Sequence, residues 1–341
     1  MSRLDLRHGR VEMAHGGGGR AMQQLIEALF LPHLDNPALR AGNDGAVLPG
    51  SGERLVVASD SHVITPLFFP GGDIGSLAVH GTINDVAMMG ARPVALSAGF
   101  ILEEGFPLAD LARIVESMGR AAAAAGVPVV TGDTKVVERG KGDGVYITTS
   151  GLGLLADGID LAGHRARPGD HVLINGSLGD HGIALLAQRD NLDFATDLRS
   201  DSAALHRLVA TLLHAAPDLR CLRDPTRGGL AATLNEIAHQ SAVGIRLREV
   251  AIPVKPAVHA VCELLGLDPL NIANEGKLVA ICPPERSAAL LAALRADPLG
   301  SEAAIIGEVV EDSGHFVQME THFGGYRTVD WLTSEALPRI C

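Results

Sequence analysis

Residues 74–90 read IGSLAVHGTINDVAMMG, a long run of small and aliphatic residues. These residues recur at helical spacing as far as residue 89, and Gly90 is a typical helix end. A short apolar strand is predicted before this helix, at residues 55–59. A second strand over 94–102 and a helix over 108–125 are predicted after it. Together with a first helix at residues 21–30, these elements predict an α+β arrangement for the first half of the chain.

The second half follows a polar stretch with Pro-Gly at residues 163–170, which is a predicted linker. Two strands before it, 127–137 and 145–155, are expected to pair with each other. After it we predict strands at 171–175, 244–248, 277–282 and 304–310, and helices at 203–215, 229–240, 257–265 and 285–296. A chain of 341 residues exceeds what one core usually serves. We therefore predict domains at residues 1–160 and 165–330, followed by a flexible tail at 331–341.

Composition excludes several classes of partner. The net charge of −12 opposes non-specific binding to nucleic acid or to an anionic membrane. It also means that an anionic substrate needs local cations or metal ions. The four cysteines form no CxxC pair, which is typical of a reducing cytoplasm. No apolar leader and no run near 18 apolar residues is found, so we expect neither secretion nor a membrane span.

Five aspartates occur where apolar segments meet Gly, Asn or Thr. Carboxylates in such settings leave room for Mg²⁺ and a phosphate, because Mg²⁺ prefers oxygen ligands and usually binds through one or two carboxylates. The alternative is that each one caps a helix or forms a turn. The number of such settings in one acidic chain favours a magnesium–nucleotide site. The five residues are Asp44, Asp60, Asp85, Asp133 and Asp224.

Glycine-rich loops add a second phosphate signal. HGGGG at residues 15–19, GSLGDHG at 176–182 and the Gly228-Gly229 pair in TRGGL can offer backbone N–H groups to phosphate, most of all at a helix start. Plain turns are an equally good reading of any single loop. A GxxxxGK[ST] motif is absent, which excludes a P-loop, and a dinucleotide fingerprint is only weakly supported. The scattered histidines show no zinc-binding spacing.

Two further positions suggest acid–base or phosphate chemistry. Lys135 follows Asp133 by two residues, so alternation along a strand places both on one face. That face can hold a metal and a phosphate, or simply a surface ion pair. Glu275 stands just before the apolar run 278–281 and is a candidate general base if it is partly buried. The alternative for Glu275 is a solvated turn.

The last residue of the chain is a cysteine, Cys341. A thiol on a free end can reach a partner enzyme and fold back into its own active site. Such a nucleophile suggests a carrier of a covalently held group. The alternative is a terminal cysteine with no role.

Several strings together resemble the HypE family of carbamoyl dehydratases, which serve the maturation of nickel–iron hydrogenases. That family belongs with aminoimidazole-ribonucleotide synthetase, selenophosphate synthetase and thiamine-monophosphate kinase. The resemblance runs from about residue 15 to residue 341. The strings are HGGGGRAMQQLI (15–26), FFPGGDIGSLAVHGTINDVAMMGARP (68–93), FILEEG (100–105), TGDTKVVERG (131–140), GSLGDHG (176–182), RDPTRGGL (223–230), IPVKPAV (252–258), ANEGKL (273–278) and PRIC (338–341).

The resemblance implies a two-domain PurM-like α+β fold, with an N-terminal mixed sheet that pairs across a homodimer. The C-terminal half would be a second α/β layer, and a flexible tail would carry Cys341. It implies ATP and Mg²⁺ as cofactors. The carbamoyltransferase HypF would load a carboxamide on Cys341, ATP would drive its dehydration to a thiocyanate, and the HypC–HypD complex would accept the cyano group.

Site residues carry over by position. Cys341 would be the acceptor, Glu275 the base, and Lys135 the group that orients the carboxamide or the transferred phosphate. The five aspartates would bind the metal. The superfamily often has a double aspartate where this chain has Asn43-Asp44, so the resemblance supports Asp44 less than Asp85 or Asp133. The remaining nucleotide-binding candidates are Asn84, Thr131, Gly132, Arg227 and Gly228.

Two other functions stay open at this point. A superfamily kinase or synthetase acting on a free small molecule would not need the tail. Selenophosphate synthetase is disfavoured because the first cysteine here is Cys221. A non-enzymatic scaffold that offers Cys341 for docking would leave the five aspartates without a purpose.

Overall fold

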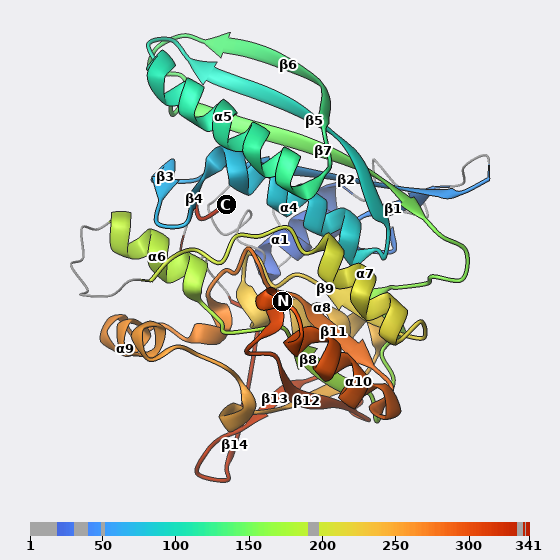
Figure 1. Cartoon of the computed structure of the whole chain (residues 1–341). Coiled ribbons are helices and arrows are strands. Elements are labelled where there is room, and N and C mark those ends of the chain that lie inside the picture. The colour runs from blue at the N-terminus through green and yellow to red at the C-terminus, as the bar shows by residue number, and fades with distance from the viewer. Residues whose placement is uncertain (1–18, 31–39, 49–51, 190–197, 333–336, 338) are drawn as a thin grey trace.

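In the computed structural model, the described residues form two large β-sheets, one in each half of the chain, and a small sheet of two short strands (Figure 1). The structure describes residues 19–30, 40–48, 52–189, 198–332, 337 and 339–341. Residues 15–18 of the HGGGG stretch, His15 and Gly16 to Gly18, therefore lie outside the described residues. Within the described part of the chain, no helix is long and apolar enough to cross a membrane.

The N-terminal sheet has the order β1-β2-β7-β5-β6 and is antiparallel except for the parallel pair β5–β6. It is therefore a mixed sheet, as expected. Two helices, α4 (Ile74–Met88) and α5 (Leu108–Ala125), pack on it and close a shared core. The strands are β1 (Ala46–Leu48), β2 (Arg54–His62), β5 (Arg92–Glu103), β6 (Val129–Val137) and β7 (Val145–Leu155).

Helix α4 begins and ends for local reasons. The Asp73 carboxylate accepts hydrogen bonds from the N–H groups of Gly75 and Ser76, and the Asp73 N–H donates to the Ser76 hydroxyl. This reciprocal arrangement is a capping box. Gly90, with φ of 76°, follows its last turn. The helix is buried almost all round, because the sheet, α5 and the C-terminal half cover it.

One pairing prediction was wrong. The strands predicted at 127–137 and 145–155 form as β6 and β7, but they do not pair with each other. β5 lies between them, parallel to β6 and antiparallel to β7. The reason is that α5 returns the chain from β5 to β6 as a crossover, which makes their pairing parallel.

The C-terminal sheet has the order β14-β13-β10-β12-β8-β11-β9. Alternate residues of its central strands face different helices: Val172 and Ile174 face α8 (Gly229–Ser241), whereas Leu173 faces α7 (His206–Ala215) and α10 (Pro284–Arg295). Both faces are therefore apolar and covered. The strands are β8 (His171–Ile174), β9 (Cys221–Arg223), β10 (Gly244–Arg248), β11 (Val279–Cys282), β12 (Ala304–Val310), β13 (Val317–Glu320) and β14 (Tyr326–Thr328).

Shorter elements complete the chain, and some were not predicted. Helix α6 (Asp180–Arg189), which starts inside the GSLGDHG loop, was not predicted. The glycines of the GSLGDHG loop are poor helix formers, so the sequence did not indicate α6. Helix α9 (Pro256–Leu265) was predicted, and it begins one residue before its predicted start. The others are α1 (Arg20–Leu25), η2 (Ile26–Phe30), β3 (Phe68–Phe69), β4 (Gly72–Asp73), η3 (Gly163–Arg165), η4 (Glu249–Ala251), η5 (Pro269–Asn271) and η6 (Pro298–Gly300).

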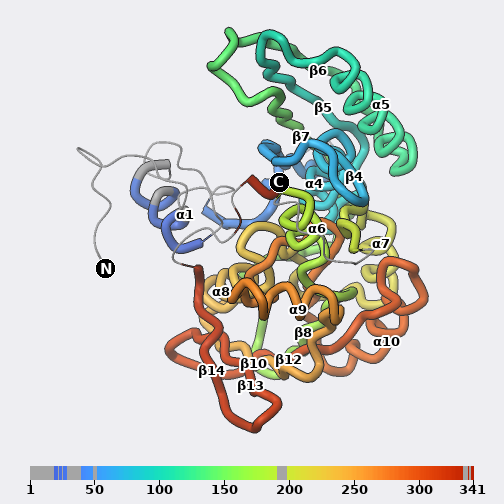
Figure 2. The backbone as a smooth tube through the Cα atoms, turned by 90° about the vertical axis from the view of Figure 1, so that its left-hand side faces the viewer, coloured from blue at the N-terminus to red at the C-terminus, as the bar shows by residue number. Residues whose placement is uncertain are grey.

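The end of the tail does not extend away from the fold. Figures 1 and 2 place the C-terminus centrally, close to α4 and α6. Ile340 forms an antiparallel bridge with Ile64, is 3% exposed, and joins the core beneath α4 and α5. The last residues are thus docked between elements of both halves.

Candidate active site

A cavity of about 210 Å³ lies where the two halves meet, and acidic side chains line it. They come from separate elements: Asp60 from β2, Asp85 from α4 and Asp224 from the segment between β9 and α8. The remaining lining residues are Asp44, Ser59, Gly81, Arg223, Thr226, Arg227, Ala232, Thr233, Glu236, Glu275 and Cys341. Four of the five predicted aspartates, the predicted base and the terminal cysteine thus share one cavity.

Arg223 ties the first acidic loop to the C-terminal half. Its Nε lies 2.9 Å from Asp44 Oδ1, its Nη2 lies 2.5 Å from Glu236 Oε2, and its Nη1 donates to the Gly42 carbonyl at 3.1 Å. Burial raises the pKa of Asp44 to about 6 in spite of this cation, because Glu236 is also close. Arg223 was not singled out from the sequence, although it stands beside Asp224.

Asp60 is held by a histidine that sequence reasoning also missed. His62 Nε2 lies 3.2 Å from Asp60 Oδ2, and the ring is 1% exposed. Burial alone would raise the pKa of Asp60, but His62, Arg227 and the Ser61 N–H together lower it to about 2. Asp60 is therefore ionised. The i, i+2 spacing of the two residues in a strand is the signal that could have found His62.

The other carboxyls crowd one another. Burial, then Asp224, Asp60 and Asp44, raise the pKa of Asp85 well above its usual value. Burial and Asp44 raise the pKa of Asp224 to about 8, even though Arg223 opposes the shift. Like charges confined in a low-dielectric cavity hold protons unless a cation neutralises them. This electrostatic pattern is what a divalent-cation site has before the ion binds.

The carboxylate oxygens of this cavity are the kind of ligand that Mg²⁺ prefers. Asp44 Oδ2 is buried without a hydrogen-bond partner, so it has a lone pair to offer. Among the described residues, however, no three His, Cys, Asp or Glu side chains converge closely enough to hold a metal alone. Mg²⁺ commonly takes only one or two carboxylates and completes its shell with water and phosphate. The arrangement thus matches a cation that arrives with a nucleotide.

Glu275 is buried and fixed through its backbone. The residue is only 4% exposed, and its Oε1 atom has no hydrogen-bond partner. Its N–H donates to Asp201 Oδ1 at 3.0 Å, and Asp201 in turn pairs with Lys277 at 2.7 Å. Burial, then Asp60 and Asp224, raise the pKa of Glu275 well above its usual value. The alternative reading of a solvated turn is therefore wrong.

Asn84, a predicted nucleotide ligand, does not line the cavity. It is 1% exposed, its Nδ2 donates to the carbonyls of Ala203 and Glu275, and its Oδ1 accepts the Leu205 N–H at 2.8 Å. In this chain its contacts connect α4 to the C-terminal half and to the Glu275 backbone.

The start of α8 faces the same cavity. Thr226 and Arg227 precede the helix, and Thr233 and Glu236 line the cavity from its first turns. Gly228 and Gly229 adopt φ of 77° and 62°, which glycine permits, and a Cβ on Gly229 would lie 2.5 Å from the Leu270 carbonyl. The N-terminal end of a helix favours anions, so this end of α8 is suited to a phosphate.

Cys341 reaches this cavity because the tail is docked. Its backbone oxygen accepts the Val63 N–H at 2.8 Å. Val63 directly follows His62, the last residue of β2, and stands three residues after Asp60. The predicted carrier thiol therefore sits beside the predicted base and aspartates.

The residues of the TGDTK string lie elsewhere in the single chain. Asp133 and Lys135 pair at 2.7 Å on the outer strand β6, with side chains 69% and 71% exposed. This confirms that they share a face and corresponds to the surface ion pair considered above. Thr131 and Gly132 are exposed on the same strand and do not line the cavity. Asp133 is thus the one predicted metal ligand that the fold of one chain does not bring to the others.

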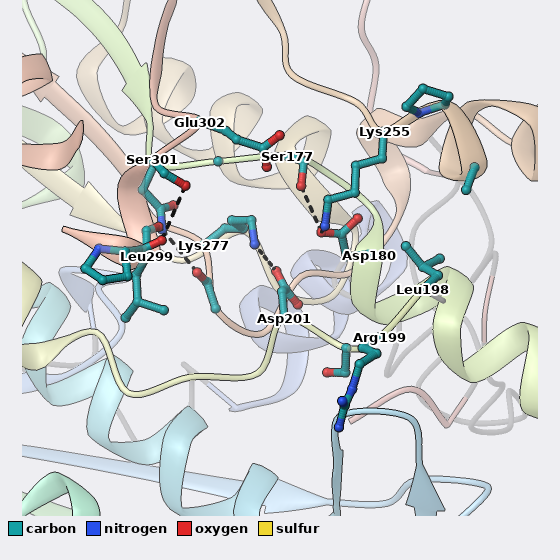
Figure 3. A pocket seen from close by; sticks show the side chains of 17 residues that line it. Ser177, Asp180, Leu198, Arg199, Asp201, Lys255, Lys277, Leu299, Ser301 and Glu302 are labelled. Atoms are coloured by element: carbon teal, nitrogen blue, oxygen red, sulfur yellow. Dashed lines mark hydrogen bonds and ion pairs between the residues drawn. The ribbon is translucent and has the colours of Figure 1, made fainter. Parts of the chain in front are cut away.

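A larger cavity, of about 720 Å³, lies on the other side of Asp201 (Figure 3). Lys277 points to Asp201, and Lys255 points to Asp180 at 2.6 Å, as the dashed lines in the figure mark. The two lysines are therefore neutralised by neighbouring carboxylates. This larger cavity is linked to the acidic site indirectly, because Asp201, which lines it, accepts a hydrogen bond from the Glu275 N–H.

The chain is similar in sequence to proteins of known family over nearly its whole length. Residues 42–155 match the family "AIR synthase related protein, N-terminal domain", and residues 167–320 match "AIR synthase related protein, C-terminal domain". The carbamoyl dehydratase HypE of Azotobacter vinelandii is 67% identical over 341 residues, which is 100% of both chains.

Solved structures agree with this result. A crystal structure of HypE in complex with ATP is similar with a TM-score of 0.82 and 53% identity, over 97% of this chain and 100% of that chain. A crystal structure of a HypE–HypF complex is similar with a TM-score of 0.87 and 46% identity, over 90% of this chain and 99% of that chain. The fold is thus the predicted PurM-like α+β fold. Together with the acidic cavity and the docked cysteine, these similarities establish that the chain belongs to the HypE family of carbamoyl dehydratases.

Proposed function

We propose that this chain uses ATP to dehydrate a carboxamide carried on the sulfur of Cys341, giving a thiocyanate. The observation that carries the proposal is the position of Cys341 in the same cavity as Asp60, Asp85, Asp224 and Glu275. A similar protein binds ATP, and the relatives named carbamoyl dehydratase share the whole length of this chain. The product would supply the cyanide ligand of a nickel–iron hydrogenase.

The chemistry follows from a poor leaving group. An amide oxygen leaves with difficulty, so the γ-phosphate of ATP is transferred to it. One N–H proton is lost as the C=N bond forms, and loss of the second proton expels phosphate and leaves S–C≡N. The overall change is carboxamide plus ATP to thiocyanate, ADP and phosphate. Glu275 is the proposed base, because its buried carboxyl has an oxygen without a hydrogen-bond partner and a raised pKa makes a carboxylate a stronger proton acceptor.

The remaining groups bind and orient. Asp44, Asp60, Asp85 and Asp224 would hold Mg²⁺, which neutralises the phosphates when bound. Arg227 and the N–H groups at the start of α8, after Gly228, would take phosphate oxygens. A cavity of about 210 Å³ holds phosphates and a thiol but is small for a whole nucleotide, so the rest of ATP would lie outside it.

A homodimer would account for the residues on β6. The outer edge of β6 pairs with no other strand among the described residues, and Val130 and Val136 are 64% and 66% exposed. Joining this edge to a second copy would bury the valines. It would also offer Thr131, Gly132, Asp133 and Lys135 to the nucleotide from the partner subunit, with Lys135 and Asp133 released from their mutual ion pair.

Other parts of the proposal concern partners and organisation. A similar protein is solved with HypF, and we propose HypF as the carbamoyl donor and the HypC–HypD complex as the cyano acceptor. We propose domains at residues 1–160 and 165–330, an ATP-binding role for the first, and a tail at 331–341. We also propose that the chain acts in the cytoplasm.

Intact-protein mass spectrometry tests the function. With the HypF carbamoyl-donor system, the protein should gain about 43 Da, and ATP with Mg²⁺ should then remove about 18 Da as water. Cys341→Ser should gain neither mass yet still bind ATP, whereas Cys262→Ser is the matched control for a cysteine outside the cavity. Turnover of a free small molecule by a chain lacking residues 338–341 would contradict the proposal and favour a superfamily kinase.

A further inference from the structure

The docked tail is held mainly through its backbone. The Val63 N–H donates to the Cys341 carbonyl at 2.8 Å, and the Thr65 N–H donates to the Arg339 carbonyl at 3.1 Å, on either side of the Ile64–Ile340 bridge. Ile340 fills a buried apolar position between them. These contacts form a short two-stranded ladder, which is marginal on its own. Further groups are needed to hold the tail in place.

Arg189, the last residue of α6, supplies such a group. Its Nε and Nη2 donate to the Thr65 carbonyl at 3.0 and 2.8 Å, and Nη2 also donates to the Arg339 carbonyl at 2.9 Å. One guanidinium thus joins the two facing segments of the ladder. Hydrogen bonds from a charged donor contribute more than neutral ones, and arginine keeps its charge at all working pH values.

A second contact comes from the other end of α6. His181 Nε2 lies 2.8 Å from the Ile340 carbonyl, and its Nδ1 lies 2.7 Å from Ser200 Oγ. A carbonyl only accepts, so Nε2 carries the proton, and Nδ1 accepts from the Ser200 hydroxyl. Burial lowers the pKa of His181, which agrees with a neutral ring.

One feature of the docked tail, the backbone conformation of Arg339, is unfavourable. Arg339 has a φ of 58°, in the left-handed region that a residue with a Cβ avoids. Its side chain pairs with Asp143, but both side chains are substantially exposed, so this pair contributes little. The strained residue is therefore held by contacts to its carbonyl, of which the one from Arg189 is charged.

We propose that Arg189 is a positioning residue that sets the fraction of molecules in which the tail is docked. The inference rests on the proposed function, because Cys341 must leave the cavity to receive its carboxamide and return for dehydration. Arg189 does not line the acidic cavity. It acts on the backbone of the tail, so it stabilises the docked arrangement whether or not the thiol is loaded.

Thiol alkylation of the full-length protein reads the docked fraction directly, because the reagent reaches Cys341 faster when the tail is out. Iodoacetamide is the probe, and Cys341→Ser gives the background from the three buried cysteines. Arg189→Gln should raise the alkylation rate of Cys341 at least about tenfold, as expected for a lost charged hydrogen bond. Arg189→Lys, which keeps the charge and a donor, should give an intermediate rate. Arg286→Gln, which removes a surface arginine paired with Asp218, should change nothing.

Single-turnover kinetics give a second readout. In Arg189→Gln the rate of dehydration should fall in proportion to the docked fraction, which is a smaller change than the rise in alkylation when most molecules are docked. Loading of Cys341 by the HypF system should stay equal or become faster. A general folding defect would slow both steps. If Arg189→Gln is not folded, the Arg189→Lys comparison alone decides. Alkylation of both variants at the wild-type rate would overturn the proposal. A wild-type protein that is never loaded would instead reject the proposed function, and the alkylation result would still stand.

Discussion

Glu275 illustrates how a single side chain is prepared for its chemistry. Its backbone N–H is held by Asp201, its carbonyl accepts from Asn84, and its carboxyl is buried with an unpartnered oxygen. The carboxyl therefore has a defined position but no fixed proton partner. This is the state in which a base can accept a proton from a substrate N–H.

Replacing Glu275 by Gln should separate binding from chemistry. The amide keeps the shape but accepts no proton, so the dehydration rate should fall by about 10²–10⁴-fold while ATP still binds. Single-turnover loss of water from the loaded protein and equilibrium ATP binding measure the two effects. Glu302→Gln, an exposed position on the larger cavity, is the control and should leave both unchanged. Unchanged dehydration in Glu275→Gln would remove it from the role of base.

At the scale of elements, the close approach of α4 and α5 keeps Asp85 in place. A Cβ on Gly75 would lie 2.2 Å from the Ile114 carbonyl of α5, so only glycine permits this packing. The first turn of α4 is set by this contact and by the Asp73 cap. Asp85 stands three turns later on the same helix, and the position of the whole helix therefore decides where its carboxylate lies.

Gly75→Ala should accordingly destabilise the protein. Forcing the two helices apart costs about 1–3 kcal/mol, which corresponds to a fall in Tm of several degrees. Gly119→Ala is the matched control, because Gly119 is exposed on α5 and a Cβ there meets nothing within 4 Å. It should be neutral or stabilising, since alanine favours helix. Thermal unfolding followed by circular dichroism compares the two, and equal Tm values would contradict the steric argument.

At the scale of the whole molecule, the open edge of β6 is where a second copy is expected. Replacing Val130 and Val136 by Lys places charges on that surface and should shift the protein from dimer to monomer in sedimentation velocity. ATP turnover should fall with it, because Thr131 to Lys135 would no longer reach a partner. Val115→Lys, at an exposed position on α5, is the control. A wild-type protein that sediments as a monomer would contradict the proposal.

The crowded carboxyls make global stability depend on pH. The pKa of Asp224 rises from 3.8 to about 8 and that of Asp44 to about 6 on folding. A raised pKa means that the folded state holds more protons, so the free energy of unfolding falls as pH rises from about 4 through about 8. Asp60 acts in the opposite sense, but its pKa of about 2 confines its effect to pH below about 4.

The Tm of the nucleotide-free protein should therefore fall between about pH 6 and pH 8.5. Asp224→Asn should flatten this fall, because the amide does not titrate. Adding ATP with Mg²⁺ should raise the Tm most at the alkaline end, where the carboxylates are ionised. Differential scanning fluorimetry across buffers of equal ionic strength measures all three. A Tm that rises with pH over this range would show that the carboxyls are not the controlling groups.

Local features could be predicted from the sequence because their physical causes are local. Helical spacing placed α4, α5 and α8 within one or two residues, and helix-ending glycines marked the ends of α4 and α5. The strands β10 and β12 form over the residues predicted for them, 244–248 and 304–310. The loop glycines concealed α6, and the short strands β9, β13 and β14 carry too few residues for a pattern. The family strings covered the whole chain, and the relatives confirm the family they indicated.

The sequence by itself therefore determined most of the longer elements, the family, and the candidate acceptor, base and metal-binding side chains. Only the tertiary structure decided which of them meet: Asp60, Asp85, Asp224, Glu275 and Cys341 come together, whereas Asp133 and Lys135 do not. It also determined that β5 lies between β6 and β7, and that Arg223, His62 and Arg189 support the site. The physical reason is the distance along the chain over which each interaction acts. Backbone preference and capping act over a few residues, whereas strand order, charge crowding and tail docking depend on contacts between segments that are distant along the chain.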